Sequence, residues 1–126
     1  MKTELLYVEL TTNYNHDGKA WIGFGQFNRT RKTVYFNGRI LGKGRSSVGN
    51  YVDIVSGEEC WVSGVKKSGE DRHWAGHGKI HIDKTAIKDY LKQINEEKLP
   101  SNKFVAVEFN NTPNIELASK IENQKL

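Results

Sequence analysis

The sequence has little cysteine, proline or methionine, and it lacks long apolar segments. Cys60 is the only cysteine among 126 residues, which excludes an internal disulfide and agrees with a reducing compartment. No apolar run approaches the roughly 20 residues that a membrane-spanning helix requires. The N-terminal stretch MKTELLYVELTTNYN alternates acidic and apolar residues, unlike the basic and then apolar pattern of a secretory signal. We therefore expect a soluble, cytoplasmic protein that does not bind a membrane.

Internal repeats and low-complexity tracts are also lacking, which argues against a repeat array. A chain of 126 residues is long enough for one modest core but too short for separate cofactor and substrate domains. We expect a single domain over residues 1–126, with a β-rich body over 1–83 and a helix–strand–helix extension over 84–126.

Acidic residues are missing from about a quarter of the chain. Residues 19–52 contain seven basic residues and no Asp or Glu, a local charge of +7 in a chain whose net charge is +4. A surface of one charge sign favours an anionic partner, although solvated basic side chains on two hairpins would give the same pattern. Besides Lys19, the basic residues are Arg29, Arg31, Lys32, Arg39, Lys43 and Arg45, and we predict that these six bind nucleic acid.

Short segments of alternating apolar residues predict strands. Residues 4–10 and 20–27 alternate in this way, and Asn37-Gly38 lies between two β-rich segments, which is a strong hairpin signal. The segments YVDIV, CWVSGVKK and GKIHID predict three further strands, separated by turn-forming residues. Such spacing favours a small antiparallel β-barrel or a strongly twisted β-meander.

The apolar period changes after Asp83, a residue that often caps helices. The segment KTAIKDYLKQINEEK places its apolar residues on one helical stripe, and Leu99-Pro100 ends it. KFVAVEF then predicts a strand, and Thr112-Pro113 predicts the start of a terminal helix. We therefore expect an α+β fold, in which the β-barrel or meander is followed by a helix, a strand and a terminal helix.

The segment GEDRHWAGHGKIHID contains three of the four histidines, and a metal site is one interpretation of it. His73, His77 and His81 would share one face of a helix, but Gly76 and Gly78 disfavour a helix here. In a strand, His77 and His81 would stand about 13 Å apart, too far for one ion to bridge. We expect neither a metal nor another cofactor.

Two other interpretations of the segment remain. His73 with Asp71, and with Cys60 as nucleophile, would have the residue types of a small enzyme, although no local motif supports catalysis. Alternatively, the loop projects from the rim of a β-scaffold as a ligand-binding site or is only a structural turn. The ligand-binding candidates are Arg72, His73, Trp74 and His77.

Aromatic residues are interleaved with the basic residues of 19–52. Small β-barrels bind single-stranded nucleic acid by stacking bases on aromatic side chains and neutralising the backbone with cations. About half of these aromatics must also fill the core. The glycine-rich stretch LGKGRSSVGNY could contact a phosphate but lacks the ordered P-loop pattern. The interleaved aromatics are Trp21, Phe24, Phe27, Tyr35, Phe36 and Tyr51.

The stretch from AWIGFGQF through TVYFNGRI to CWVSGVKKSGEDRHWAGHGKIHID resembles a family of short, uncharacterised bacterial proteins, over about the first three quarters of the chain. Some members carry an automatic label as deoxyxylulose-phosphate synthase. That label does not fit this chain, because the thiamine enzyme is several times longer and needs acidic metal ligands in a large pocket. The resemblance therefore implies no activity and no catalytic residues.

Three functions follow as hypotheses, and we expect binding rather than catalysis. The first is a non-catalytic binding module whose basic, aromatic face recognises single-stranded nucleic acid or another polyanion. The second is a regulatory domain whose basic segment meets an acidic protein surface. The third is a small enzyme that uses the Asp71–His77 loop.

Overall fold

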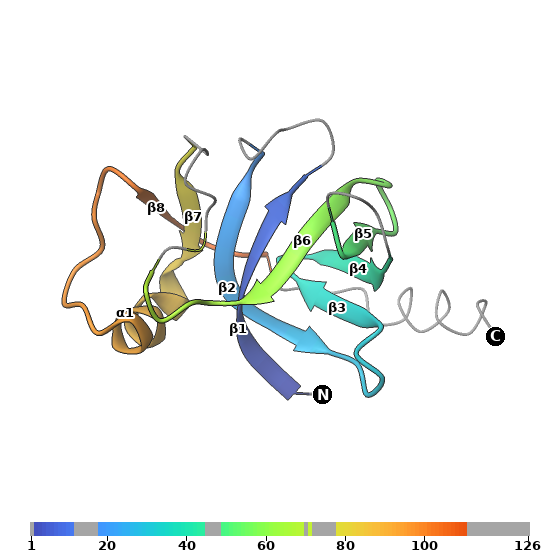
Figure 1. Cartoon of the computed structure of the whole chain (residues 1–126), viewed down its shortest axis with the longest axis horizontal. Coiled ribbons are helices and arrows are strands. Elements are labelled where there is room, and N and C mark those ends of the chain that lie inside the picture. Colours follow the sequence, from blue (N-terminus) through green and yellow to red (C-terminus); the bar gives the residue numbers. More distant parts are fainter. Residues whose placement is uncertain (1, 12–17, 45–48, 70, 72–77, 111–126) are drawn as a thin grey trace.

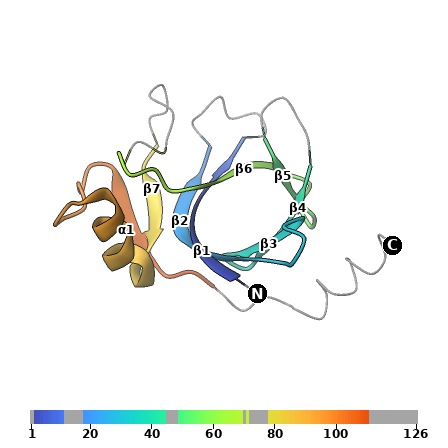
Figure 2. The same cartoon turned by 60° about the horizontal axis from the view of Figure 1, so that its bottom comes forward.

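A closed ring of six strands forms the body of the molecule (Figures 1 and 2). The computed structural model describes residues 2–11, 18–44, 49–69, 71 and 78–110. Each strand is antiparallel to the next, and the ring closes because β1 pairs with both β2 and β6. The predicted small β-barrel is therefore confirmed. Its strands are β1 (Lys2–Leu10), β2 (Ala20–Phe27), β3 (Thr33–Phe36), β4 (Arg39–Lys43), β5 (Tyr51–Asp53) and β6 (Glu59–Gly64).

Side chains that alternate along these strands fill the interior of the barrel. Successive side chains of a strand point to opposite faces, so Leu6 and Val8 of β1 lie on the same face as Trp21 of β2. The resulting core draws on every strand of the ring and takes up four of the six interleaved aromatics. Its buried members are Leu6, Val8, Leu10, Trp21, Phe27, Val34, Phe36, Leu41, Tyr51, Cys60 and Val62.

The predicted hairpin at Asn37-Gly38 joins β3 to β4. Both residues have positive φ angles, 48° and 74°, which suit the tight turns that match the twist of paired strands. Asn and Gly are the residues that adopt this conformation most readily. The turn fixes the register in which Phe36 lies opposite Arg39.

Two further strands extend the sheet beyond the ring. Strand β7 (Ile80–Asp83) runs parallel to the first half of β2, and β8 (Phe104–Val107) runs parallel to β7. The sequence predicts a strand here correctly, but its placement in the antiparallel meander is wrong. Because β1 occupies the free edge of β6 and closes the ring, the next strand pairs elsewhere, at the edge of β2 that β3 leaves open.

A second core lies between the ring and this added layer. It contains alternate residues of β1 and β2, such as Tyr7 and Ile22, packed against Ile82 of β7 and Tyr90 of the helix. In Figure 2, α1 lies against β7 on the side away from the ring. Strand β2 is therefore shared, because one of its faces lines the barrel and the other supports the added layer.

The helical region begins where the sequence predicts. The Asp83 carboxylate accepts hydrogen bonds from the backbone N–H and the hydroxyl of Thr85, at 3.4 and 2.9 Å, and a short 3₁₀ turn η1 (Lys84–Ala86) follows. Helix α1 (Ile87–Ile94) then ends at Asn95 in the left-handed conformation. Among the described residues only these two elements are helical, so the helical part is smaller than the α+β prediction implies. The predicted terminal helix lies outside the described residues.

Candidate functional site

Two of the six predicted nucleic-acid-binding cations lie against carboxylates. Arg31 Nη1 lies 2.7 Å from Glu4 Oε2, and its guanidinium stacks 3.8 Å from the centre of the Phe27 ring. Arg39 Nη1 lies 2.8 Å from Asp53 Oδ2 and 3.4 Å from Glu58 Oε1. The Glu4 carboxylate raises the pKa of the exposed Arg31, chiefly through their hydrogen bond. These two arginines therefore add little net positive charge to the surface.

Three of the six cations extend into solvent near one another in the fold. Lys32 and Lys43 are exposed at the end of the β3–β4 hairpin, where the Lys43 N–H donates to the Lys32 carbonyl at 2.7 Å. Arg29 is exposed in the turn between β2 and β3. No described residue forms an ion pair with any of the three. We call Arg29, Lys32 and Lys43 the basic rim; Arg45 lies outside the described residues.

The remaining two interleaved aromatics belong to the outer surface. Phe24 of β2 and Tyr35 of β3 alternate with core residues and are only partly buried. Gln26 lies between them in the fold, since it follows Phe24 by two residues and pairs directly with Tyr35. A row of three side chains, Phe24, Gln26 and Tyr35, therefore crosses the two strands on one face.

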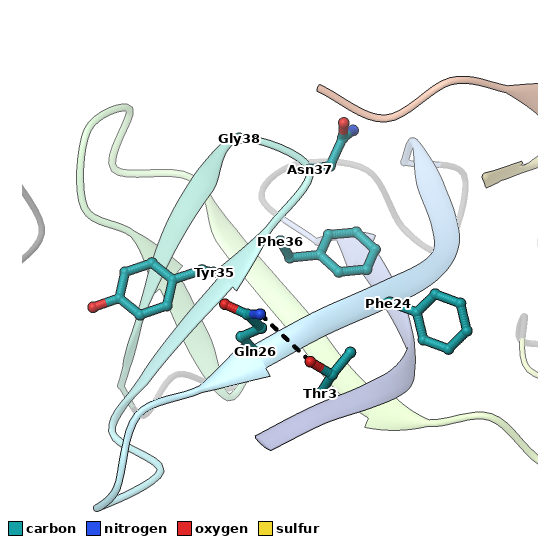
Figure 3. A pocket seen from close by; sticks show the side chains of 7 residues that line it. All are labelled: Thr3, Phe24, Gln26, Tyr35, Phe36, Asn37 and Gly38. Carbon is teal, nitrogen blue, oxygen red and sulfur yellow. Dashed lines mark hydrogen bonds between the residues drawn. The ribbon is translucent and has the colours of Figure 1, made fainter. Parts of the chain in front are cut away.

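A cavity of about 250 Å³ opens at this row (Figure 3). Strands β2 and β3 pair at only two positions, Gln26 with Tyr35 and Phe27 with Val34, and they separate beyond them. The cavity lies where they separate, and its described lining holds aromatic, carboxamide, hydroxyl and glycine groups but no carboxylate and no Lys, Arg or His side chain. The lining residues are Thr3, Phe24, Gln26, Tyr35, Phe36, Asn37 and Gly38.

The polar groups of the cavity suit an uncharged ring with hydrogen-bonding edges. Gln26 Nε2 donates to Thr3 Oγ1 across a long 3.4 Å contact, so the amide is only weakly held. A carboxamide presents two donors and one carbonyl acceptor, the set that recognises a nucleobase edge. Phe24 and Tyr35 offer the ring faces on which such a base could stack.

Within the Asp71–His77 loop, the structure describes only Asp71. Asp71 Oδ1 accepts a hydrogen bond from the Lys66 N–H at 2.7 Å, while Oδ2 is buried and has no hydrogen-bond partner among the described residues, and burial raises the pKa of this carboxyl. The buried hydroxyl of Tyr90 also has no partner in the described part of the chain. Burial raises the Tyr90 pKa to about 12, and the nearby Asp71 carboxylate adds to the shift. The ligand-binding candidates Arg72, His73, Trp74 and His77 lie outside the described residues.

Cys60 lies in the barrel core and has the surroundings of a structural thiol. It is fully buried beside the Arg39–Asp53 pair, and burial raises its pKa to about 11. A nucleophilic cysteine needs a lowered pKa and access to substrate. No group of three or more His, Cys, Asp or Glu side chains within the described part of the chain could hold a metal ion. The catalytic hypothesis that joins Cys60 or Asp71 to His73 stays a prediction.

Sequence reasoning misses most of the polar lining. Thr3 and Gln26 carry no motif, and Asn37-Gly38 indicates only a turn. The alternation of β2 does place Phe24 and Gln26 on the same face, so this part of the signal is present in the sequence. The separation of β2 from β3, which makes the cavity, is a property of the strand pairing and carries no sequence motif.

Comparison with known proteins finds no match to this chain. No protein-family model, no curated protein and no solved structure matches it. The described helices include none with the length and apolar character needed to cross a membrane. The features that bear on function are therefore the cavity and the basic rim.

Proposed function

We propose that this protein is a non-catalytic module that binds single-stranded nucleic acid. One base would enter the cavity and stack on Phe24 or Tyr35, while the carboxamide of Gln26 or Asn37 contacts its edge. The basic rim would neutralise flanking phosphates. The observation that carries this proposal is an aromatic and carboxamide cavity next to unpaired cations.

The spacing of these groups supports the proposal. Arg29 follows Gln26 by three residues, and Lys32 precedes Tyr35 by three. The Cα atoms of these two cations therefore lie at most about 11 Å from the Cα atom of a residue that lines the cavity. A single strand can therefore place a base in the cavity and a neighbouring phosphate at the rim. Acidic side chains are absent from the described cavity lining, so nothing there repels a phosphate.

The first test is fluorescence anisotropy with labelled single-stranded oligoadenylate and oligothymidylate at low and physiological salt. The Arg29→Ala/Lys32→Ala double variant should bind both more weakly. Its salt dependence should flatten, with the slope of log K against log salt falling by about 0.7 for each phosphate that the variant no longer neutralises. The matched control is Lys88→Ala/Lys92→Ala, which removes the same charge from exposed positions of α1. Equal weakening in both variants would show that binding depends only on the net charge of the protein, and it would contradict the proposed surface.

A protein partner is the second candidate. Trp61 on the outer face of β6 is 47% exposed, which is unusual for so large an apolar side chain. Tryptophan is enriched among the residues that dominate protein interfaces. The first experiment separates the two candidates, because a protein-binding domain would show no salt-sensitive oligonucleotide binding at the rim.

A further inference from the structure

The wall of the barrel between β2 and β3 is closed in part by a segment from the far end of the described chain. Strand β2 pairs with β1 at eight positions but with β3 at only two. Where the β2–β3 ladder ends, residues Glu108, Phe109 and Asn110 approach the gap directly after β8, and we call these three residues the strap. In Figure 3 the chain that follows β8 passes above the cavity and ends beside Asn37.

The ring of Phe109 fits the gap because β2 has a glycine there. Gly23 is buried on the core face of β2, and a methyl group added to it would overlap the Phe109 ring. The same ring meets Phe36 edge to face, with 5.0 Å between ring centres. Phe109 is only partly buried, although it packs against the barrel core.

The backbone of Asn110 holds the strap at the hairpin turn. Its N–H donates to Asn37 Oδ1 at 3.1 Å, an exposed hydrogen bond. A Cβ at Gly38 would lie 2.9 Å from the Asn110 carbonyl oxygen, so the turn accepts the strap only with glycine at this position. The contacts of the strap therefore include one aromatic ring in a slot, one backbone amide on a carboxamide and an exposed ion pair, in which Glu108 Oε1 lies 3.8 Å from Lys84 Nζ.

These contacts use residues that also line the cavity. Phe36, Asn37 and Gly38 belong to both sets, so the cavity and the Phe109 slot are adjoining parts of one groove along the separation of β2 and β3. An aromatic ring in a slot, with an N–H donor on a carboxamide oxygen, is also what a nucleobase would supply. The strap thus reproduces the contacts of a ligand ring.

We propose that the strap is a displaceable closure that competes with a second base of a bound single strand for the Phe109 slot. This inference rests on the proposed function of the cavity. The strap is suited to release, because Glu108 and Asn110 are exposed and Phe109 is only partly buried, whereas β8 itself pairs with β7 at four positions. Binding of a strand longer than one nucleotide would then open the wall, and a docked strap would lower the apparent affinity.

Two variants test the competition in the full chain. Phe109→Ala removes the ring and leaves the slot open, whereas Gly23→Ala adds a methyl group that would overlap either the Phe109 ring or a base in the same place. If the strap is docked about nine-tenths of the time, Phe109→Ala should bind oligoadenylate about 10-fold more tightly than the wild type, and Gly23→Ala should not. The control is Val105→Ala on β8, which shortens an exposed apolar side chain away from the slot. Unchanged or weaker binding in the folded Phe109→Ala variant would overturn the competition and make the strap a supporting wall.

Hydrogen exchange of the wild-type protein gives a second, independent readout. On adding oligoadenylate, the Asn110 amide should exchange faster, because its bond to Asn37 is broken, while the amides of β2 and β3 exchange more slowly. Slower exchange at Asn110 would contradict displacement.

The fluorescent dye anilinonaphthalene sulfonate separates this inference from the proposed function. The dye carries aromatic rings but no base or sugar, so it reports whether the slot opens even if no oligonucleotide binds. Greater dye binding in Phe109→Ala than in Gly23→Ala and Val105→Ala, at temperatures where all are folded, would support a slot closed by the strap. If the oligonucleotides fail to bind but the dye result holds, nucleic acid is the wrong ligand and the closure stands. Equal dye binding in all variants would overturn the closure.

Discussion

The two neighbours of β2 in the ring form very different walls. Against β1 it makes an antiparallel ladder of eight residue pairs, and against β3 it makes only two. The first wall buries side chains on both faces, since Leu6 lies in the barrel core and Tyr7 in the second core. The second wall contains the cavity and needs Phe109 to cover part of it. The difference separates the part of the barrel that provides stability from the part that can accommodate a ligand.

Core truncations in the two walls should show the largest effect. Leu6→Ala removes a side chain that is 2% exposed, and we expect a loss of about 2 to 5 kcal/mol in the free energy of unfolding. Phe109→Ala should cost less, about 1 to 2 kcal/mol, because the ring is only partly buried and the gap is already open. Urea denaturation measures both values. An equal or larger loss for Phe109→Ala would show that the strap is an integral part of the wall.

Removing one arginine from each region sharpens the comparison. Arg39 joins β4 to the buried Asp53 within a continuous ladder, and Arg39→Ala would leave that carboxylate without its cation. We expect a loss of about 2 kcal/mol, reduced from the value for a fully buried pair because Arg39 is partly exposed. Arg31→Ala, near the end of the β2–β3 ladder, breaks an exposed pair and should cost less than Arg39→Ala. Thermal unfolding at low and high salt measures the stability lost in each variant. A larger loss for Arg31→Ala than for Arg39→Ala would contradict the prediction.

One aromatic residue at the cavity and one on the opposite side of the β1–β2 wall should differ in binding rather than in stability. Phe24→Ala at the cavity should weaken oligoadenylate binding by about 1 to 3 kcal/mol, the usual contribution of one stacked base. Trp61→Ala, on β6 across the β1 wall, should leave that affinity unchanged. Anisotropy titrations of both variants provide the measurement. Weaker binding in Trp61→Ala alone would move the interface to the other side of the barrel.

The smallest effect should come from Asp71, which lies outside both walls. Burial raises its pKa in the folded state, so the folded protein binds this proton more tightly than the unfolded chain. The protonated form therefore stabilises the fold at low pH, and this contribution is lost as pH rises through the raised pKa. Asp71→Asn keeps the oxygen that accepts from Lys66 and should remove that decline. Denaturation between pH 3 and pH 7 would show it, and an unchanged pH dependence in the variant would contradict this assignment.

Alternation and turn residues predict the ring well, because each acts over a few neighbouring residues. The pattern of β2 and the Asn37-Gly38 turn are examples, and Asp83 marks the helix start for the same reason. The position of β7 could not be predicted, since it depends on which sheet edge stays open after β1 and β6 pair. The candidate site is harder still. Basic residues can be counted from the sequence, but the carboxylates that neutralise Arg31 and Arg39 lie far away along the chain.

Closure of the ring through β1 also has a consequence for how the protein is made. Leu10 pairs with Cys60, so the pairing of β1 stays incomplete until β6, which comes later in the chain, has been added. Ring closure therefore depends on contacts between residues far apart in sequence, which form slowly compared with hairpins. The hairpins β1–β2 and β3–β4 can form during synthesis, but the barrel core cannot be sealed until β6 has left the ribosome. A nascent chain that ends before Glu59 therefore leaves the edge of β1 that pairs with β6 open, next to apolar residues that the closed barrel buries.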